Sequence, residues 1–322
     1  MKNFAIFISP LIIAFFAIQI GEIDFFSAMN GIYKYIFFNT ELDNNASIIF
    51  DIRFPRILLA ILVGASLSGC GAIMQNIFKN PLIDPFLLGI SSGAALGCAM
   101  SIGIFPNISL SLLAFCGAFF SSILILLIGK VANNTSLILC GVVISAFLSA
   151  ITALIQFFVP AQESQAITIW LFGSLSLATF GDIALVLVGF IISFIPLFIL
   201  SRKINILSLS EDEAISLGIN TWAIKIICML CVSFICALCV SVSGTIGWIG
   251  LIVPHIARFL VGANMKILLP SSLALGASVL LISDSIARGV SNFDLPLGAI
   301  NAIIFAPFFL FIVYRYIKNA RN

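Results

Sequence analysis

Charged side chains are scarce in this 322-residue sequence. Only 9% of its residues are Asp, Glu, Lys or Arg, whereas 61% are hydrophobic; an average soluble domain carries about 25% charged residues. A globular protein of this size could not cover its surface with so few charges, so a lipid bilayer must solvate most of the molecule. The formal net charge of +2 is too small to indicate a nucleic-acid partner.

The residues that enzymes and ion-coupled carriers need are also few. No G-x-x-x-x-G-K-[ST] loop is present to bind nucleotide phosphates, and the only histidine, His255, lies in an apolar run. Proton- or sodium-driven carriers place ionisable groups at mid-membrane, but the acids here fall near segment ends. These acids are Asp84, Asp182, Asp284 and Asp294. The chain is therefore expected to perform no catalysis, to need no cofactor and to take its energy from another protein.

The eight cysteines do not change that expectation, because all of them lie inside apolar runs. Cys228-x-x-Cys231 and Cys236-x-x-Cys239 imitate metal or redox pairs, but no histidine or acid lies near them. We interpret them as small residues that pack inside a helix. Neither a metal site nor a disulfide framework is expected.

Long apolar runs dominate the chain. A bilayer crossing needs roughly 20 residues, and hydropathy indicates about ten such segments. They cover approximately residues 4–20, 57–78, 86–105, 108–129, 136–159, 182–201, 222–243, 247–262, 267–287 and 297–317. The predicted fold is all-α, a polytopic membrane protein that forms a single transmembrane domain over residues 1–322. The first run lacks an A-x-A-like cleavage site, so a retained helix is expected rather than a removed signal peptide.

The distribution of Lys and Arg predicts the orientation. With the N-terminus inside, eleven cationic residues fall on the cytoplasmic side and four outside, so both termini are predicted to be cytoplasmic. Three of the four outer cations are arginines at the outer ends of helices: Arg53, Arg56 and Arg288. They either anchor helix ends by snorkelling or present guanidinium forks to the carboxylates of a partner.

A proline-rich break follows the 57–78 run. The Asn80–Pro85 segment ends that helix, because proline lacks the N–H and forces the preceding residue out of the α region. The next run carries Gly93 and Gly97 in a G-x-x-x-G motif, which allows another helix to approach closely. The break is therefore read as a sharp turn at one face of the bilayer.

One internal loop, residues 202–221, is polar and large enough for a soluble partner to grip. Ser208 or Ser210 is a candidate N-cap, acids at 211–213 suit a first helical turn, and Gly218 is placed as the stop. The pattern predicts a short surface helix of about two turns. That helix either caps the bundle or docks a soluble subunit.

Four stretches closely resemble the FecCD-type permeases, which are membrane subunits of bacterial ABC importers for iron–siderophores, haem and cobalamin. These stretches are residues 53–97, 244–270, 280–288 and 295–315, and the strings NPLIDPFLLGISSGA and GLIVPHIAR are their most specific parts. The resemblance covers essentially the whole chain. It implies two permease subunits, identical or paired homologues, with two cytosolic ATPases and one periplasmic or lipoprotein substrate-binding protein, in the bacterial cytoplasmic membrane.

The resemblance also assigns roles to individual residues. Arg53, Arg56 and Arg288 resemble arginines that dock glutamates on the two lobes of the binding protein. The cytoplasmic gate maps onto Asn80, Leu82, Thr135 and Ser136. The ATPase coupling segment maps onto Leu207–Asn220, with Glu211, Asp212, Ala214, Leu217 and Gly218. Thr245 departs from the pattern, because the family usually has proline there.

The function expected from the resemblance is that of a permease subunit that moves a ferric siderophore, with haem or cobalamin as alternative cargo. ATP hydrolysis is expected on a separate chain. The walls of the pathway are expected to be apolar and weakly interacting. The alternative from a different class is an ion-coupled secondary transporter, which would carry cargo even when ATP is depleted.

Overall fold

The structure, a computed structural model, describes residues 2–20, 44–129, 134–208, 211–290 and 293–320. All regular structure in these ranges is helical. The helices are α1 (Lys2–Gln19), α3 (Asn44–Ser47), α4 (Phe54–Ile77), α5 (Ile90–Gly103), α6 (Leu110–Gly129), α7 (Asn134–Phe158), α8 (Ala161–Leu171), α9 (Phe180–Ile199), α10 (Ser201–Ile206), α11 (Glu211–Ser216), α12 (Thr221–Ser243), α13 (Ile249–Val261), α14 (Met265–Gly289) and α15 (Leu297–Ala320). A π-helical segment, η1 (Ile48–Arg53), precedes α4, and a 3-10 turn, η2 (Pro85–Leu88), precedes α5.

Six of the described helices are long and apolar enough to cross a membrane, and four shorter apolar helices accompany them. Each apolar run expected from the sequence falls on one of these segments. The all-α, multi-pass membrane fold is therefore confirmed, while the exact number of crossings stays a prediction.

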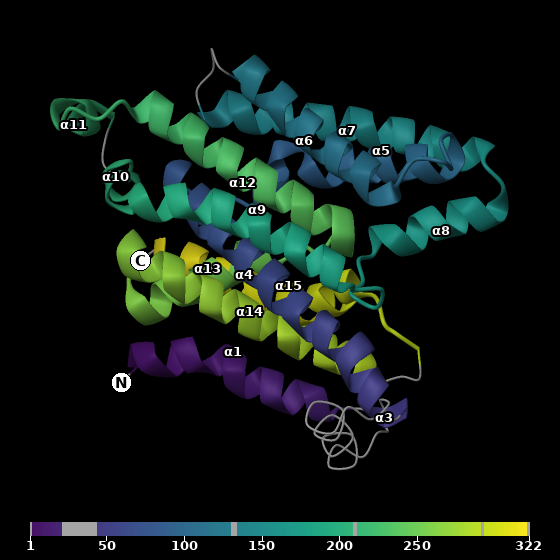
Figure 1. The fold of residues 1–322 in the computed structure, drawn as a ribbon. Coiled ribbons are helices and arrows are strands. Elements are labelled where there is room, and N and C mark those ends of the chain that lie inside the picture. Colours follow the sequence, from purple (N-terminus) through teal and green to yellow (C-terminus); the bar gives the residue numbers. More distant parts are fainter. Residues whose placement is uncertain (1, 21–43, 130–133, 209–210, 291–292, 321–322) are drawn as a thin grey trace.

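The long helices lie side by side as a bundle with two distinct ends (Figure 1). The marks for the N- and C-termini lie at the left-hand end in that view, together with α10 and α11, and we call this the α11 end. Helix α3 and the start of α4 lie at the other end, which we call the arginine end. The common side of the two termini agrees with an even number of crossings.

Close backbone approaches hold the bundle together. Helix α5 packs most extensively on α6, and α4 on α14. A Cβ atom added to Gly93 would overlap the carbonyl oxygen of Gly117 on α6, and one added to Gly64 would overlap the carbonyl oxygen of Gly276 on α14. The close helix approach predicted from the G-x-x-x-G motif is confirmed for Gly93, and Gly97 likewise faces the backbone of α6 at Leu113.

The proline-rich break forms as the sequence predicted. Helix α4 ends at Ile77, and Asp84 then caps η2, because its Oδ1 accepts a hydrogen bond from the backbone N–H of Phe86 at 2.8 Å. Gly89 takes a left-handed φ of 69° between η2 and α5, which glycine adopts without steric cost. The break thus turns the chain back into the bundle.

Two features of the chain differ from the expectation. The polar loop holds two short helices, α10 and α11, rather than one, since the chain turns at Leu207 between them; Ser210, one of the two candidate caps, lies outside the described residues. Helix α8 was not expected at all. Its sequence, AQESQAITIWL, is too short and too polar to stand out as an apolar run.

Hydrogen bonds join the end of α8 to the turn that carries Thr245 and to the start of α15. The Thr245 hydroxyl donates to the carbonyl oxygen of Leu171 at the end of α8. The backbone N–H groups of Leu297 and Gly298 donate to the carbonyls of Gly173 and Phe172 at 3.1 and 3.0 Å. A threonine thus supplies a tether at the position where the resemblance led us to expect a rigid proline.

Candidate functional site

The three arginines singled out in the sequence lie together at the arginine end of the bundle. Arg56 donates from Nε to Asp284 Oδ1 at 2.8 Å and from Nη1 to both carboxylate oxygens of Asp294 at 3.0 Å. Arg288 donates from Nε to Asp284 Oδ2 at 3.1 Å. We call Arg53, Arg56, Arg288, Asp284 and Asp294 the arginine cluster.

The arginine cluster is mostly buried. The side chain of Asp284 is 0% exposed and that of Arg56 only 6%, whereas Asp294 is 40% exposed. Arg53 has no carboxylate partner among the described residues. The cluster of three cations and two anions therefore carries one positive charge in excess.

Two of these guanidinium groups also cap helix α1. Arg53 Nη1 donates to the carbonyl oxygen of Ile18 at 2.8 Å, and Arg288 Nη2 donates to that of Ala17 at 3.2 Å. The last carbonyls of a helix have no partner within the helix, and cations are favourable there. The arginine cluster thus fastens α1 to α4 and α14. The three arginines were predicted from the sequence as site residues, but their bonds to the carboxylates and to the end of α1 were not.

The predicted gate residues lie on two elements, the turn after α4 and the first turn of α7. Asn80 Oδ1 accepts a hydrogen bond from the backbone N–H of Leu82 at 3.0 Å, which fixes a tight turn, and Leu82 is 49% exposed. Thr135 and Ser136 form the first turn of α7, with Thr135 exposed. Helix α7 packs directly on η2, so the structure puts the two loops on neighbouring elements.

The predicted coupling residues belong to α11 and the turn after it. Ala214 is buried, whereas Leu217 is 60% exposed, so one face of this short helix packs on the bundle and the other is open. Gly218 ends the helix in the left-handed region, with φ at 73°, as the sequence predicted. Glu211 and Asp212 open α11, and their side chains fall outside the described part of the chain.

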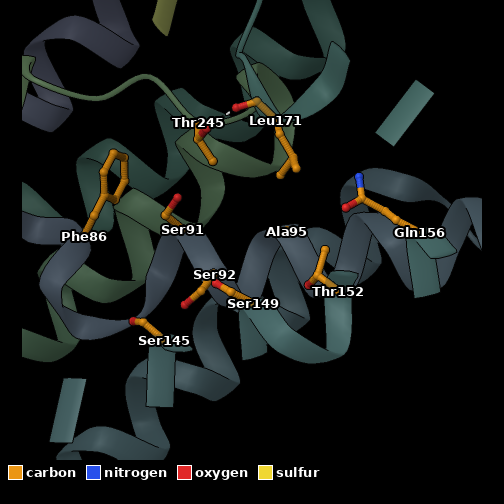
Figure 2. A pocket seen from close by; sticks show the side chains of 10 residues that line it. All are labelled: Phe86, Ser91, Ser92, Ala95, Ser145, Ser149, Thr152, Gln156, Leu171 and Thr245. Atoms are coloured by element: carbon orange, nitrogen blue, oxygen red, sulfur yellow. Dashed lines mark hydrogen bonds between the residues drawn. The ribbon is translucent and has the colours of Figure 1, made fainter. Parts of the chain in front are cut away.

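A recess that the sequence reading missed lies between α5, α7, α8 and the Thr245 turn. It has a volume of about 430 Å³. Figure 2 shows its lining, which is rich in hydroxyl groups. The lining residues are Phe86, Ser91, Ser92, Ala95, Ser145, Ser149, Thr152, Gln156, Leu171 and Thr245. We call it the hydroxyl recess.

The signal for the hydroxyl recess was present in the 136–159 run. Ser145, Ser149, Thr152 and Gln156 recur at intervals of four, three and four residues, which puts them on one face of a helix. The run was read for its hydropathy alone, so its polar face was overlooked.

A second recess adjoins the first one. Its volume is about 460 Å³, it shares Phe86 and Ser145 with the hydroxyl recess, and Asp84 and Trp248 also line it. Burial raises the pKa of Asp84 to about 6. Trp248 has a φ of 74°, which is rare for a bulky residue and found where surrounding structure imposes it. We call this the aromatic recess.

Comparison with known proteins decides the family. The model of the FecCD transport family matches residues 6–315. The chain belongs to the FecCD transport family. It is thus a membrane permease of the ABC transporter type.

The relatives of this FecCD chain are similar along most of their length. It is 50% identical over 279 residues to the "Probable iron chelatin transport system permease protein" of Helicobacter pylori, covering 86% of this chain and 85% of that one. It is 35% identical to the molybdate import system permease protein MolB of Haemophilus influenzae, covering 85% and 83%. A solved structure of a metal-chelate type ABC transporter, in an inward-facing conformation, matches with a TM-score of 0.87 at 32% identity, covering 97% of this chain and 98% of that one.

Neither a metal centre nor a disulfide emerges from the parts of the FecCD chain that the structure describes. They hold no group of three or more His, Cys, Asp or Glu side chains that could bind a metal ion. All eight cysteines are free thiols, and five of them are buried among the helices.

Proposed function

We propose that this FecCD permease is the membrane-spanning subunit of an ABC importer that moves a ferric chelate across the bacterial cytoplasmic membrane. The observation that carries the proposal is the likeness, over the whole chain, to a metal-chelate type ABC transporter. The 50% identical relative, whose name refers to iron chelatin transport, supports iron as the metal. Haem, cobalamin and molybdate are the alternative cargoes.

In this proposal, ATP is hydrolysed by two copies of a separate cytosolic ATPase, and α11 transmits the motion. The open face of α11, with Ile215 61% and Leu217 60% exposed, offers apolar contacts to a soluble partner. Helix α11 stands off from the bundle in Figure 1, and its packing on α12 supplies a route for movement into the bundle. Lys and Arg predominate at this end of the helices, which favours a cytoplasmic position.

At the opposite end, the arginine cluster is proposed to dock the carboxylates of a substrate-binding protein. Its excess positive charge favours an acidic partner. Arg53 is only 7% exposed but has no carboxylate to displace among the described residues. Because Arg56 already binds Asp284 and Asp294, a docking carboxylate reaches it only by replacing the exposed Asp294. Docking is thus an exchange of carboxylates rather than the filling of an empty site.

The permeation gate is proposed to consist of the Asn80–Leu82 turn and the first turn of α7. Two such permease subunits, identical or paired homologues, would face each other across the pathway. The exposed Leu82 and Thr135 are then the side chains that close it from this subunit. Movement of α11 opens or shuts that constriction.

Reconstitution of the complex tests the proposal directly. Proteoliposomes that contain this chain, the ATPase and the binding protein should accumulate ⁵⁵Fe-labelled ferric chelate only when ATP is supplied. Accumulation driven by an ion gradient with ATP depleted would instead establish a secondary transporter. Competition with haem, cobalamin and molybdate identifies the cargo class.

A pair of matched variants tests the coupling surface. Leu217→Asp should release the ATPase during co-purification, because it puts a charge on the open face of α11. Leu177→Asp makes the same change at an 89% exposed leucine near the start of α9, at the arginine end, and should retain the ATPase. Equal ATPase yields from both variants would contradict the role of α11.

Neutralisation of Arg53 tests the docking surface. Arg53→Gln keeps an N–H donor for the carbonyl oxygen of Ile18 and should abolish the stimulation of ATP hydrolysis by the binding protein, while the basal rate and the membrane yield stay at wild-type levels. We choose a neutral replacement because Arg53 is only 7% exposed, so a carboxylate there would damage the fold, as would a change at Arg56 or Arg288, which share the buried Asp284. Full stimulation of the Arg53→Gln variant would count against docking at this end.

A further inference from the structure

We propose that the hydroxyl recess is a water-filled section of the transport path in which uncharged hydroxyls bind the oxygen atoms of a metal chelate. This inference rests on the proposed function, because it takes the chain to be a permease. It replaces the apolar wall expected from the sequence with a polar one on this side of α7.

The first argument is that three hydroxyls of the recess have no internal partner. The hydroxyls of Ser91, Ser145 and Ser149 make no hydrogen bond to any described residue; Ser91 and Ser145 are partly buried and Ser149 is exposed to the recess. Thr152, by contrast, donates to the carbonyl oxygen of Leu148 at 2.9 Å. A polar group in an apolar medium is costly unless it is hydrogen-bonded. These three serines therefore require water or a polar ligand.

The second argument comes from the two faces of α7. Only 11% of an 18-residue stretch of this helix is buried in the chain. One exposed face is apolar and suits lipid tails or a second permease subunit. It includes Leu139, Val143, Phe147, Leu154 and Phe158. The face toward the recess carries the polar residues instead, and irregular or polar surface at membrane depth is tolerated where it lines a water-filled cavity.

Figure 2 shows how several elements converge on this space. Ser91 and Ser92 come from the start of α5, Ser145, Ser149 and Thr152 from α7, and Thr245 from the turn beside α8. Residues more than 100 positions apart in the sequence thus supply one polar lining. Such convergence is what distinguishes a binding recess from a stripe on one helix.

Size and charge indicate the class of ligand. The hydroxyl recess measures about 430 Å³ and shares the lining residues Phe86 and Ser145 with the aromatic recess of about 460 Å³. Ligand sites typically measure about 300–1,000 Å³. No charged side chain lines the hydroxyl recess. Hydroxyls both donate and accept, so they match the carboxylate or hydroxamate oxygens of a chelate. Neutral hydrogen bonds are weak in net terms, which lets the cargo leave again.

Two adjacent cysteine substitutions test whether the recess holds water. Ser149→Cys and Ala150→Cys lie at nearly the same depth on α7 and both positions are exposed, but only the first lines the recess, whereas the second lies beside the apolar face. In the assembled complex, a charged, membrane-impermeant thiol reagent should label Ser149→Cys at least about tenfold faster, after subtraction of the labelling of native cysteines. Equal labelling rates, or faster labelling at position 150, would overturn the proposal.

Filling the recess tests contact with cargo. Ser145→Leu should lower the ATP-driven uptake of ⁵⁵Fe-labelled ferric citrate and of a ferric trihydroxamate at least about tenfold, with complex yield and basal ATP hydrolysis unchanged. The matched control is Ser111→Leu, which fills a recess of about 480 Å³ between α6, α9 and α12 and should leave uptake at the wild-type rate.

The outcomes separate this inference from the proposed function. Wild-type uptake by Ser145→Leu, or an equal loss in both leucine variants, would refute contact between the recess and the cargo. If the unmodified complex takes up no ferric chelate with ATP, the proposed function fails, while the labelling of Ser149→Cys still reports on water in the recess. Substrate protection of that cysteine by ferric citrate would directly support contact.

Discussion

Replacement of Asp284 by asparagine tests whether one buried carboxylate holds the arginine end of the bundle together. Asparagine keeps the shape of the side chain and creates no cavity, so the change removes the negative charge and turns one of the two acceptor oxygens into an N–H donor. Two guanidinium groups, of Arg56 at 2.8 Å and Arg288 at 3.1 Å, lose their shared partner. Both remain largely buried, at 6% and 11% exposure.

The expected cost is large because the charges cannot reach water. Removal of one partner from a buried ion pair typically destabilises a protein by about 3–5 kcal/mol. Asp294 provides the matched control: it also binds Arg56, but it is 40% exposed, and exposed ion pairs contribute about 0–1 kcal/mol. Asp284→Asn should therefore lower the free energy of unfolding by several kcal/mol more than Asp294→Asn.

The assay is thermal unfolding of both variants in detergent, followed by size-exclusion chromatography of the heated protein. At roughly 2 °C per kcal/mol for a larger domain, Asp284→Asn should lower the apparent Tm by roughly 6–10 °C, and Asp294→Asn by no more than roughly 2 °C. Added salt should leave the difference unchanged, because buried pairs are poorly screened.

A double-mutant cycle sharpens the test. If Asp284 and Arg288 act as a pair, the losses in Asp284→Asn and Arg288→Gln should fall short of additivity by about 0.5–3 kcal/mol. Equal apparent Tm values for Asp284→Asn and Asp294→Asn would refute the reasoning, because burial would then make no difference to the value of the charge.

Four further predictions concern other parts of the bundle. Gly93→Val should lower the free energy of unfolding by about 1–3 kcal/mol, because the new side chain would overlap the carbonyl of Gly117. Gly218→Ala lies in open space but at a φ of 73°, and it should lower that free energy by only about 1–2 kcal/mol. The apparent Tm of each variant measures both effects. Burial raises the pKa of Asp84 from 3.8 to about 6, so the folded protein binds the proton more tightly than the unfolded chain does. The resulting stabilisation is fully present below pH 3.8 and is lost as the pH rises through 6. Asp84→Asn should thus gain stability relative to wild type between pH 4 and pH 7, and a flat difference would contradict it. Thr245→Val should lose about 1 kcal/mol through its missing hydrogen bond, whereas Thr245→Ser should not.

The sequence predicted the membrane class and the close helix contact at Gly93 because both depend on local composition. Apolar runs of bilayer length need only be counted, and a G-x-x-x-G motif on such a run presents a smooth face whatever its partner. Gly218 was likewise placed correctly as a helix stop, because a left-handed residue favours glycine locally. Helix α8 escaped prediction since its short, mixed sequence differs little from that of a loop.

Only the tertiary structure decided what the polar side chains meet. Arg56 and Asp284 are 228 residues apart, and no periodicity links them, so the sequence could not reveal that the predicted docking arginines already hold internal carboxylates. The hydroxyl recess likewise forms from α5, α7 and the Thr245 turn, whose hydroxyls lie far apart along the chain. Hydropathy is a property of single segments and is readable from the sequence, whereas pairing and cavities arise from distances between segments, which exist only once the helices have packed.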